Sequence, residues 1–430
     1  MSATFDPIQS LPRGVATAPS AARWESAGQD ALSRIFGDEV PGDQHSTVAD
    51  YIEAAAAPYV SPDLISRDSL AEIGHVANLL PGAVTDFFGF ECPLGVLAPT
   101  ADFLVCSRAS QGGREVLTDR SPGRSLPANF NQHPVWQQVF AFSRAWDDPT
   151  SPLFEAVHNI WMEFDMDGKP ASIPVPSLFL GSNLLARREP ARRLKRMPEH
   201  CAWLTDQALP LLLGRPLDRS ICRQVACCVN LLPAGARIFQ VGLMLSRATA
   251  VTRLCVRGLA SVQIPEYLEA IGWEGARGEV EATVDKLAPL VERIDLDIDV
   301  GDSVMPKIGL ECYPAQDLTK LRAFMNYLMS CGLCVEPKAD GLVRWAGLAH
   351  ERVTPQMWPR ELLALSSFLG GRVESAFFRW LHHVKVVHVP DHPPAAKAYL
   401  AVHHQWIAPG DLKQMLSRAT SEPRDHGRTH

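Results

Sequence analysis

The chain of 430 residues carries 41 lysines and arginines against 48 aspartates and glutamates, which gives a formal net charge of -7. This balance argues against a nucleic-acid-binding protein, because contacts with phosphates require a basic surface. Apolar residues make up 46% of the chain, enough for a large core. A chain of this length could form two or three domains of the usual size, but a barrel can contain more residues in one domain, so we expect a single domain.

Both ends of the chain are predicted to lie outside this domain. The N-terminal region is rich in Ala, Ser, Pro and Gly without periodicity, and residues 1–60 are assigned to a flexible arm. Residues 416–430 are polar and are predicted to form a disordered tail, which leaves residues 61–415 for the domain. No segment suits a transmembrane helix or a signal peptide, so we expect a cytoplasmic protein with no membrane partner.

Pairs of short strands separated by turn residues recur along the chain. A short turn joins only antiparallel strands, so each pair is predicted to form a hairpin. Asp167-Gly168-Lys169-Pro170 is a strong turn sequence of this kind. The five predicted hairpins pair residues 86–91 with 102–107, 158–166 with 173–180, 237–245 with 252–258, 293–300 with 305–313, and 383–389 with 396–404.

The strand with the clearest pattern covers residues 293–300 and reads R-I-D-L-D-I-D-V. Alternation with a period of two places its aliphatic side chains on one face and its aspartates on the other. The apolar face would pack against helices, so the polar face needs another space. A closed barrel with a polar lumen provides it, and the residues predicted to face inward here are Asp295, Asp297 and Asp299.

Helical patterns separate the hairpins. Residues 318–331 carry a broad apolar stripe, and Asp317 is the predicted N-cap. Other helices are predicted at residues 200–213, 219–231, 266–271, 280–291, 358–368 and 373–381. The resulting order predicts an α+β fold, an antiparallel ten-stranded barrel of repeated α-β-β-α units with the helices outside and a polar lumen.

The cysteine and histidine pairs of the sequence give little support for a metal site. Cys331 and Cys334 form a C-x-x-C without a second ligand pair, which is more typical of a helix end than of zinc. His382-His383 and His403-His404 are poor chelates, because neighbouring strand residues point to opposite faces. No metal site is therefore predicted. The basic runs at residues 187–188 and 192–196 indicate a solvated face, with docking of an acidic leader peptide or carrier as the alternative.

The polar residues of the predicted lumen suggest an anion site. Buried charges need partners, water or a charged ligand. Cationic side chains with a tyrosine would bind a diphosphate, and Glu91 would accept a proton from an aromatic nucleophile. The alternative is a lumen whose charges form internal salt bridges. The residues assigned to the cationic ring are Arg253, Arg257, Lys307, Lys385, Lys397 and Tyr399.

The α-β-β-α units resemble the barrel of the soluble aromatic prenyltransferases, the ABBA or dimethylallyl-tryptophan-synthase class, over roughly residues 65–415. Lys397-Ala398-Tyr399 is similar to the Lys-x-Tyr pairs that hold the prenyl diphosphate in that family. Glu91 lies where the family's general base would fall. This sequence departs from the pattern in having Trp161-Met162-Glu163 in place of one Lys-x-Tyr pair and no tyrosine after Lys307.

The resemblance implies an enzyme of secondary metabolism that transfers a prenyl group to an aromatic amino acid, alkaloid or peptide. Trp161, Phe239 and Tyr313 would face the allylic cation. No cofactor would be required, although Mg²⁺ could bridge the lumen aspartates to the diphosphate. The alternatives are an accessory barrel that binds a peptide or metabolite and a structural helper with a salt-bridged lumen.

Overall fold

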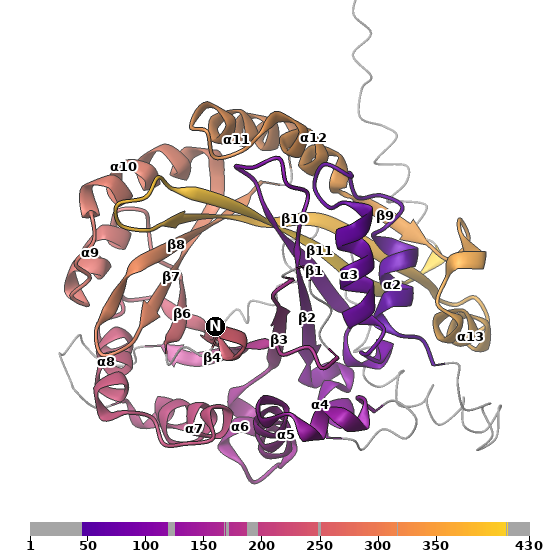
Figure 1. Cartoon of the computed structure of the whole chain (residues 1–430), viewed down its shortest axis with the longest axis horizontal. Coiled ribbons are helices and arrows are strands. Elements are labelled where there is room, and N and C mark those ends of the chain that lie inside the picture. The colour runs from indigo at the N-terminus through magenta and orange to yellow at the C-terminus, as the bar shows by residue number, and fades with distance from the viewer. Residues whose placement is uncertain are drawn as a thin grey trace, which may run out of the picture.

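The computed structural model describes residues 45–118, 125–166, 168, 172–186, 197–247, 251–315, 317–409 and 411. Within these ranges, five antiparallel hairpins follow one another around a ring that is surrounded by helices (Figure 1). The hairpins are β1 Phe87–Pro93 with β2 Asp102–Arg108, β3 Asn159–Phe164 with β4 Ser177–Ala186, β5 Arg237–Leu243 with β6 Thr252–Arg257, β7 Val291–Val300 with β8 Val304–Pro314, and β10 Glu374–His388 with β11 Ala395–Ile407.

The ring closes because the last strand pairs with the first. Strand β11 pairs with β1 from Phe87 opposite His403 to Pro93 opposite Lys397, and with β10 on its other side. Closure leaves none of these ten strands with an unpaired edge. The predicted antiparallel ten-stranded barrel is thus confirmed. An additional short strand, β9 Gly347–His350, pairs with the first half of β10 outside the ring.

The helices lie between the hairpins in sequence and outside the barrel in space (Figure 1). They cover the outer faces of the strands, as the α-β-β-α order predicts. Their bounds are α2 Val48–Ala55, α3 Arg67–Ala77, α4 Gly113–Leu117, α5 Pro134–Asp147, α6 Pro152–Ala156, α7 Leu209–Leu213, α8 Arg219–Asn230, α9 Gln263–Ala270, α10 Arg277–Leu287, α11 Leu318–Ser330, α12 Glu336–Trp345 and α13 Arg360–Phe368.

The main hydrophobic core fills the layer between strands and helices. On β1, Phe88 and Phe90 face outward and are fully buried, and Phe90 contacts Trp345 of α12 with ring centroids 6.5 Å apart. Phe87 points the other way, into a small apolar cluster inside the barrel. The strands therefore use period-two alternation to separate a helix-covered face from a lumen face.

One predicted helix is wrong. Residues 373–381 belong almost entirely to β10, not to a helix. The reason is that the lumen is apolar at this level: Trp380 packs inside the barrel while Phe377 packs outside. Alternation is hidden where both faces of a strand are apolar. By contrast, the N-cap of α11 is confirmed, since Asp317 accepts a hydrogen bond from the Lys320 backbone N–H at 2.8 Å.

Part of the predicted N-terminal arm is folded. Residues 48–55 form α2, in which Val48 and Ala55 are fully buried, and residues 45–60 therefore belong to the domain. Residues 1–44, the tail at 416–430 and the basic runs at 187–188 and 192–196 lie outside the described residues. Three residues of the predicted turn at 167–170 do so as well.

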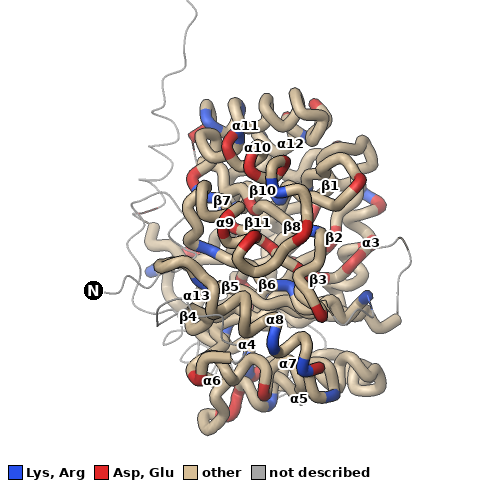
Figure 2. The backbone as a smooth tube through the Cα atoms, turned by 90° about the vertical axis from the view of Figure 1, so that its left-hand side faces the viewer, with Lys and Arg blue, Asp and Glu red and all other residues tan. Residues whose placement is uncertain are grey.

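The charges on the outside of the molecule are mixed in sign. On the side shown in Figure 2, acidic and basic residues are interspersed along the helices. Among the described residues, no helix combines the length and the apolar character needed to cross a membrane. The unusual concentration of charge lies inside the barrel.

Where β1 pairs with β11 to close the barrel, the backbones approach too closely to admit a side chain at Gly89. A Cβ atom on Gly89 would lie 2.3 Å from the Leu400 carbonyl oxygen, so Gly89→Ala must displace backbone. We expect a loss of about 1–3 kcal/mol in the free energy of unfolding, measured by urea denaturation. Gly74→Ala in α3 is the control, because nothing lies within 4 Å of that added methyl group and the helix gains propensity. Equal stabilities of the two variants would contradict the prediction.

Candidate active site in the barrel lumen

The lumen contains a cavity of about 130 Å³ lined by side chains from most of the strands. For comparison, an engineered apolar cavity of about 150 Å³ binds benzene. The cavity therefore offers room for roughly one aromatic ring. The aromatic side chains that line it from the lumen face are Phe87, Trp161, Phe179, Phe239, Tyr313 and Tyr399.

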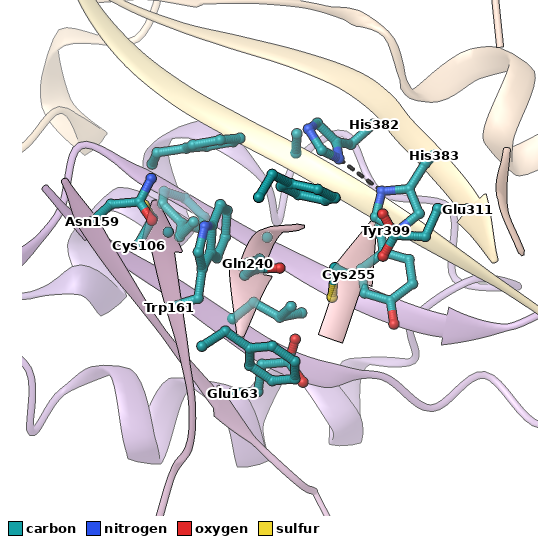
Figure 3. A pocket seen from close by; sticks show the side chains of 18 of the residues that line it. Cys106, Asn159, Trp161, Glu163, Gln240, Cys255, Glu311, His382, His383 and Tyr399 are labelled. Atoms are coloured by element: carbon teal, nitrogen blue, oxygen red, sulfur yellow. Dashed lines mark hydrogen bonds and ion pairs between the residues drawn. The ribbon is translucent and has the colours of Figure 1, made fainter. Parts of the chain in front are cut away.

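The two ends of the barrel differ in chemistry. The turn end is where each hairpin turns, and the helix end is where helices connect successive hairpins. The aromatic side chains gather toward the helix end, where Trp161 meets Phe87 edge-on at a centroid distance of 4.9 Å and Phe87 stacks on Trp380 at 5.5 Å. Figure 3 shows Trp161 and Gln240 projecting into this part of the pocket.

Two of the aromatic rings at the helix end already hold cations. The Arg257 guanidinium lies 3.9 Å above the Phe239 ring, and the Arg293 guanidinium lies 3.8 Å above the Tyr313 ring. Both arginines also bond to Asp295, which is completely buried. Of the three rings expected to face an allylic cation, Trp161 is the one to which the structure gives no cation partner among the described residues.

Closure of the barrel brings the predicted base and the Lys-x-Tyr pair together. Glu91 on β1 lies directly opposite Tyr399 on β11. The Lys397 ammonium and the Tyr399 hydroxyl both donate to its carboxylate. Burial by itself would raise the pKa of Glu91, but the charge of Lys397 lowers it below its ordinary value. Glu91 is thus an ionised, tightly bound partner of these two residues, and it does not line the pocket.

The aspartates of β7 face the lumen, as their alternation predicts, and each has a cationic partner. Arg253 binds Asp299 through two hydrogen bonds of 2.7 and 3.1 Å, while Asp295 binds Arg257. Asp297 is 2.7 Å from the Lys385 ammonium. The structure therefore realises much of the salt-bridged lumen that was the alternative to an anion site.

Lys385 stands at the centre of this network. Its ammonium also lies 3.3 Å from Glu311 and 4.9 Å from the centre of the Tyr399 ring. Cys255, Asp297 and Glu311 each bring one ligand atom within 4.8 Å of the others, which is a geometry that a metal ion could use. The cation at this position is supplied by Lys385, and the aspartates are paired, so the residues do not fit the Mg²⁺ bridge considered above.

A cluster of four cations lies at the turn end and is called here the turn-end cluster: Arg247, Arg253, Lys307 and Lys397. All four lie at the turns or at the turn-side ends of their strands, and none of them lines the cavity. Burial and the charge of Arg253 lower the pKa of Lys307, Asp299 acts in the opposite direction, and Lys397 and Arg247 lower it further. The structure gives Lys307 no ion pair with a described residue. Arg247 was missed because it lies after β5, outside the strand alternation; it binds Asp165 at 2.9 Å.

The candidate residues therefore do not form one ring. The structure distributes them over three levels of the lumen. Arg253, Lys307 and Lys397 lie toward the turn end, Glu91, Tyr399 and Lys385 lie nearer the middle, and Arg257, Tyr313 and Trp161 lie toward the helix end.

Two histidines depart from the alternation expected of a strand. A register shift between Leu381 and His383 lets both His382 and His383 line the pocket. Their Nδ1 atoms are 2.8 Å apart, so one of them carries the proton of this hydrogen bond (Figure 3). His383 also stacks on Tyr399 with centroids 4.1 Å apart. A β-bulge of this kind cannot be read from period-two alternation.

Two carboxyls line the cavity among the described residues, and sequence reasoning selected neither as a site residue. Glu311 binds Lys385 and the Tyr313 hydroxyl, and Glu163 is the other. It projects into the pocket from β3, two residues from Trp161 (Figure 3). The structure gives it no hydrogen bond or ion pair with a described residue. Burial, followed by the nearby charge of Glu91, raises the pKa of Glu163 to about 8, although Lys385, Arg253 and Arg247 act in the opposite direction.

Known proteins resemble this chain in structure and not in sequence. No family model and no curated protein matches the sequence. Among solved structures, the chain is similar to AnaPT from Neosartorya fischeri, with 12% identity and a TM-score of 0.41 over 89% of this chain and 98% of that one. It is also similar to prenyltransferase PriB in a ternary complex with L-tryptophan and dimethylallyl thiolodiphosphate, with 11% identity and a TM-score of 0.39 over 91% and 99%.

Because Lys385 lies between two buried carboxylates, we predict that removing its ammonium group strongly destabilises the fold. Lys385→Met keeps the aliphatic length but leaves Asp297 and Glu311 without their shared ammonium. We expect the free energy of unfolding to fall by about 3–5 kcal/mol in urea denaturation, because an uncompensated buried charge remains. Lys320→Met on the exposed side of α11 is the control and should change little. A stability unchanged by Lys385→Met would show that the network does not depend on this ammonium.

The raised pKa of Glu163 predicts a pH-dependent stability difference. Between about pH 4.5 and 8 the folded chain holds a proton on Glu163 that the unfolded chain has released, so this group destabilises the fold as pH rises. Glu163→Gln removes the effect. The variant should gain stability over the wild type at pH 8 relative to pH 5, measured by urea denaturation at both values. The same difference at both pH values would mean that Glu163 titrates normally.

Proposed function

We propose that this protein transfers a prenyl group from an allylic diphosphate to an aromatic acceptor held in the barrel lumen. The observation that carries the proposal is the arrangement of the lumen: an aromatic cavity lies toward the helix end, and four cations outside the cavity lining lie toward the turn end. An allylic diphosphate has the same two parts, an anionic head and an apolar chain. Its head would bind the turn-end cluster, and its chain would extend toward the aromatic rings.

The turn-end cluster has the properties of a diphosphate site. Arginine and lysine provide charge and several donors, and guanidinium groups bind phosphate oxygens in pairs. Lys307 has no carboxylate to give up, whereas Arg253 and Lys397 would exchange Asp299 and Glu91 for the phosphate oxygens. Concentrated positive charge would also stabilise the diphosphate as it leaves.

The aromatic level has the properties of an acceptor site. It has room for roughly one ring, and its aromatic walls would shield an allylic cation from water. The free face of Trp161 would stabilise that cation. An aromatic amino acid, an alkaloid and an aromatic side chain of a peptide each present such a ring. Glu163 and Glu311 line the cavity, and Glu91 lies behind Tyr399. Glu311 is held by Lys385 and the Tyr313 hydroxyl, so Glu91 and Glu163 are the candidates to receive the acceptor's proton.

A second candidate function is an accessory barrel that binds a metabolite or peptide without chemistry. The observation that favours it is the pairing of Arg253, Arg257, Lys385 and Lys397 with carboxylates of the chain itself. A lumen neutralised in this way is stable without a ligand. Binding of an allylic diphosphate separates the two functions.

Calorimetric titration with dimethylallyl thiolodiphosphate, which resists cleavage, tests the anion site. We expect binding by the wild type and a loss of affinity of about 10- to 100-fold in Lys307→Ala, because a charge-assisted bond is worth about 1.5–3 kcal/mol. Lys320→Ala on α11 removes the same charge away from the lumen and should leave affinity unchanged. Absence of binding by the wild type at millimolar ligand would refute the prenyl-transfer proposal and leave the accessory barrel.

A further inference from the structure

We infer that Glu163, rather than Glu91, takes the proton from the aromatic acceptor. This inference rests on the proposed prenyl transfer and names the residue that completes it. The two carboxyl groups lie in the same part of the lumen, on β3 and β1, and they differ in access and in partners. Those differences decide which of them can reach an acceptor.

An acceptor in the cavity can reach Glu163 more directly than Glu91. Glu163 lines the cavity, as do its neighbours on the lumen face of β3, Trp161 and Asn159. An acceptor ring packed against Trp161 would therefore lie beside the Glu163 carboxyl, one strand repeat away. Glu91 does not line the cavity, and the Tyr399 side chain that binds it does. The acceptor would meet Tyr399 before it could meet Glu91.

The hydrogen-bond donors around the two carboxyl groups also favour Glu163 as the base. Lys397 and Tyr399 both donate to the Glu91 carboxylate, so taking a proton there would break an ion pair. Such a group is a weak base, because its charged form is the one that its surroundings stabilise. The Glu163 carboxyl has no such donors among the described residues. A base freed from ion pairs and partly desolvated accepts a proton more readily.

The reaction balances with this assignment. The allylic carbon–oxygen bond breaks, and its electron pair leaves with the diphosphate toward the turn-end cluster. An electron pair of the acceptor then forms the bond to the allylic carbon. The bond between hydrogen and the attacked atom breaks next, its electrons return to the acceptor, and the proton passes to the Glu163 carboxylate. Glu163 returns this proton to solvent before the next cycle.

The charged groups that face Glu163 set the pH range in which it can act. These are Glu91 and Tyr399 from the paired strands β1 and β11, Lys385 from β10, Arg253 from β6 and Arg247 after β5. Glu163 must be ionised to take a proton, and its pKa is about 8. The rate should therefore rise with pH and level off above about 8. A base with the lowered pKa of Glu91 would already be ionised throughout the neutral range.

The test measures kcat/KM for prenyl transfer between pH 5.5 and 9.5, since this ratio reports ionisations of the free enzyme. For the wild type, kcat/KM should rise with pH and level off above about 8; this rising part of the pH profile is called the limb below. Glu163→Gln should lose about 10²–10⁴-fold in kcat/KM at pH 8 and show no limb, while its affinity for dimethylallyl thiolodiphosphate stays that of the wild type. Glu163→Asp should recover part of the rate and the limb, because it restores a carboxylate. Circular dichroism melting confirms that each variant is folded.

Glu91→Gln is the matched variant. It should keep the limb and shift it to lower pH, because a neighbouring negative charge is removed from Glu163. A Glu163→Gln variant with the wild-type rate and profile overturns the inference, as does a limb that disappears only in Glu91→Gln. Loss of analogue binding in Glu163→Gln overturns it too, since the residue would then act in binding. A wild type that binds no analogue refutes the proposed function itself, which is a distinct result.

Discussion

Pairing of the last strand with the first is the constraint on which the rest of the structure depends. Until β11 lies against β1, the polar faces of the strands look onto an open sheet, and their charges could remain in water. Closure removes those faces from bulk solvent and makes the carboxylates and cations of the strands each other's partners. The same pairing sets Tyr399 opposite Glu91 and brings Lys397 to the Glu91 carboxylate. Stability and the arrangement of the site therefore have one origin.

Burial of charge then dictates how the lumen is organised. A charged group enclosed in protein needs a partner of opposite sign, and one-to-one pairs across neighbouring strands are the simplest solution. Arg253 with Asp299 follows this rule across β6 and β7, whereas Asp295 binds both Arg257 and Arg293. Lys385 serves two carboxylates at once, and a protonated Glu163 needs no cation near neutral pH. Among the described residues, Lys307, Glu163 and the cavity-lining Arg237 have no ion pair, and such groups are free to act on a ligand.

Separation of charge and aromatic surface along one axis is the feature of the lumen on which the proposed function rests. A salt-bridged barrel without an apolar level would be an inert scaffold, and an aromatic cavity without cations would bind neutral ligands. Here the aromatic level lines the cavity, and the turn-end cluster lies outside the cavity lining, toward the turns of the hairpins. The rings at the helix end are partly occupied by Arg257 and Arg293, so the useful apolar surface narrows to the region of Trp161 and its neighbours. This arrangement leaves room for a small, flat group.

The sequence by itself determined the strands, their hairpins and the face to which each side chain points. Alternation in residues 293–300 sufficed to place Asp295, Asp297 and Asp299 in the lumen, because the period of a strand is a local property. It failed for residues 373–381, where both faces are apolar, and for His382 and His383, where a bulge interrupts the period. The partners were decided by the tertiary structure alone. Which cation meets which carboxylate, which carboxyl lines the cavity and how far Glu163 lies from Glu91 depend on register and closure between strands remote in sequence, and no local pattern encodes them.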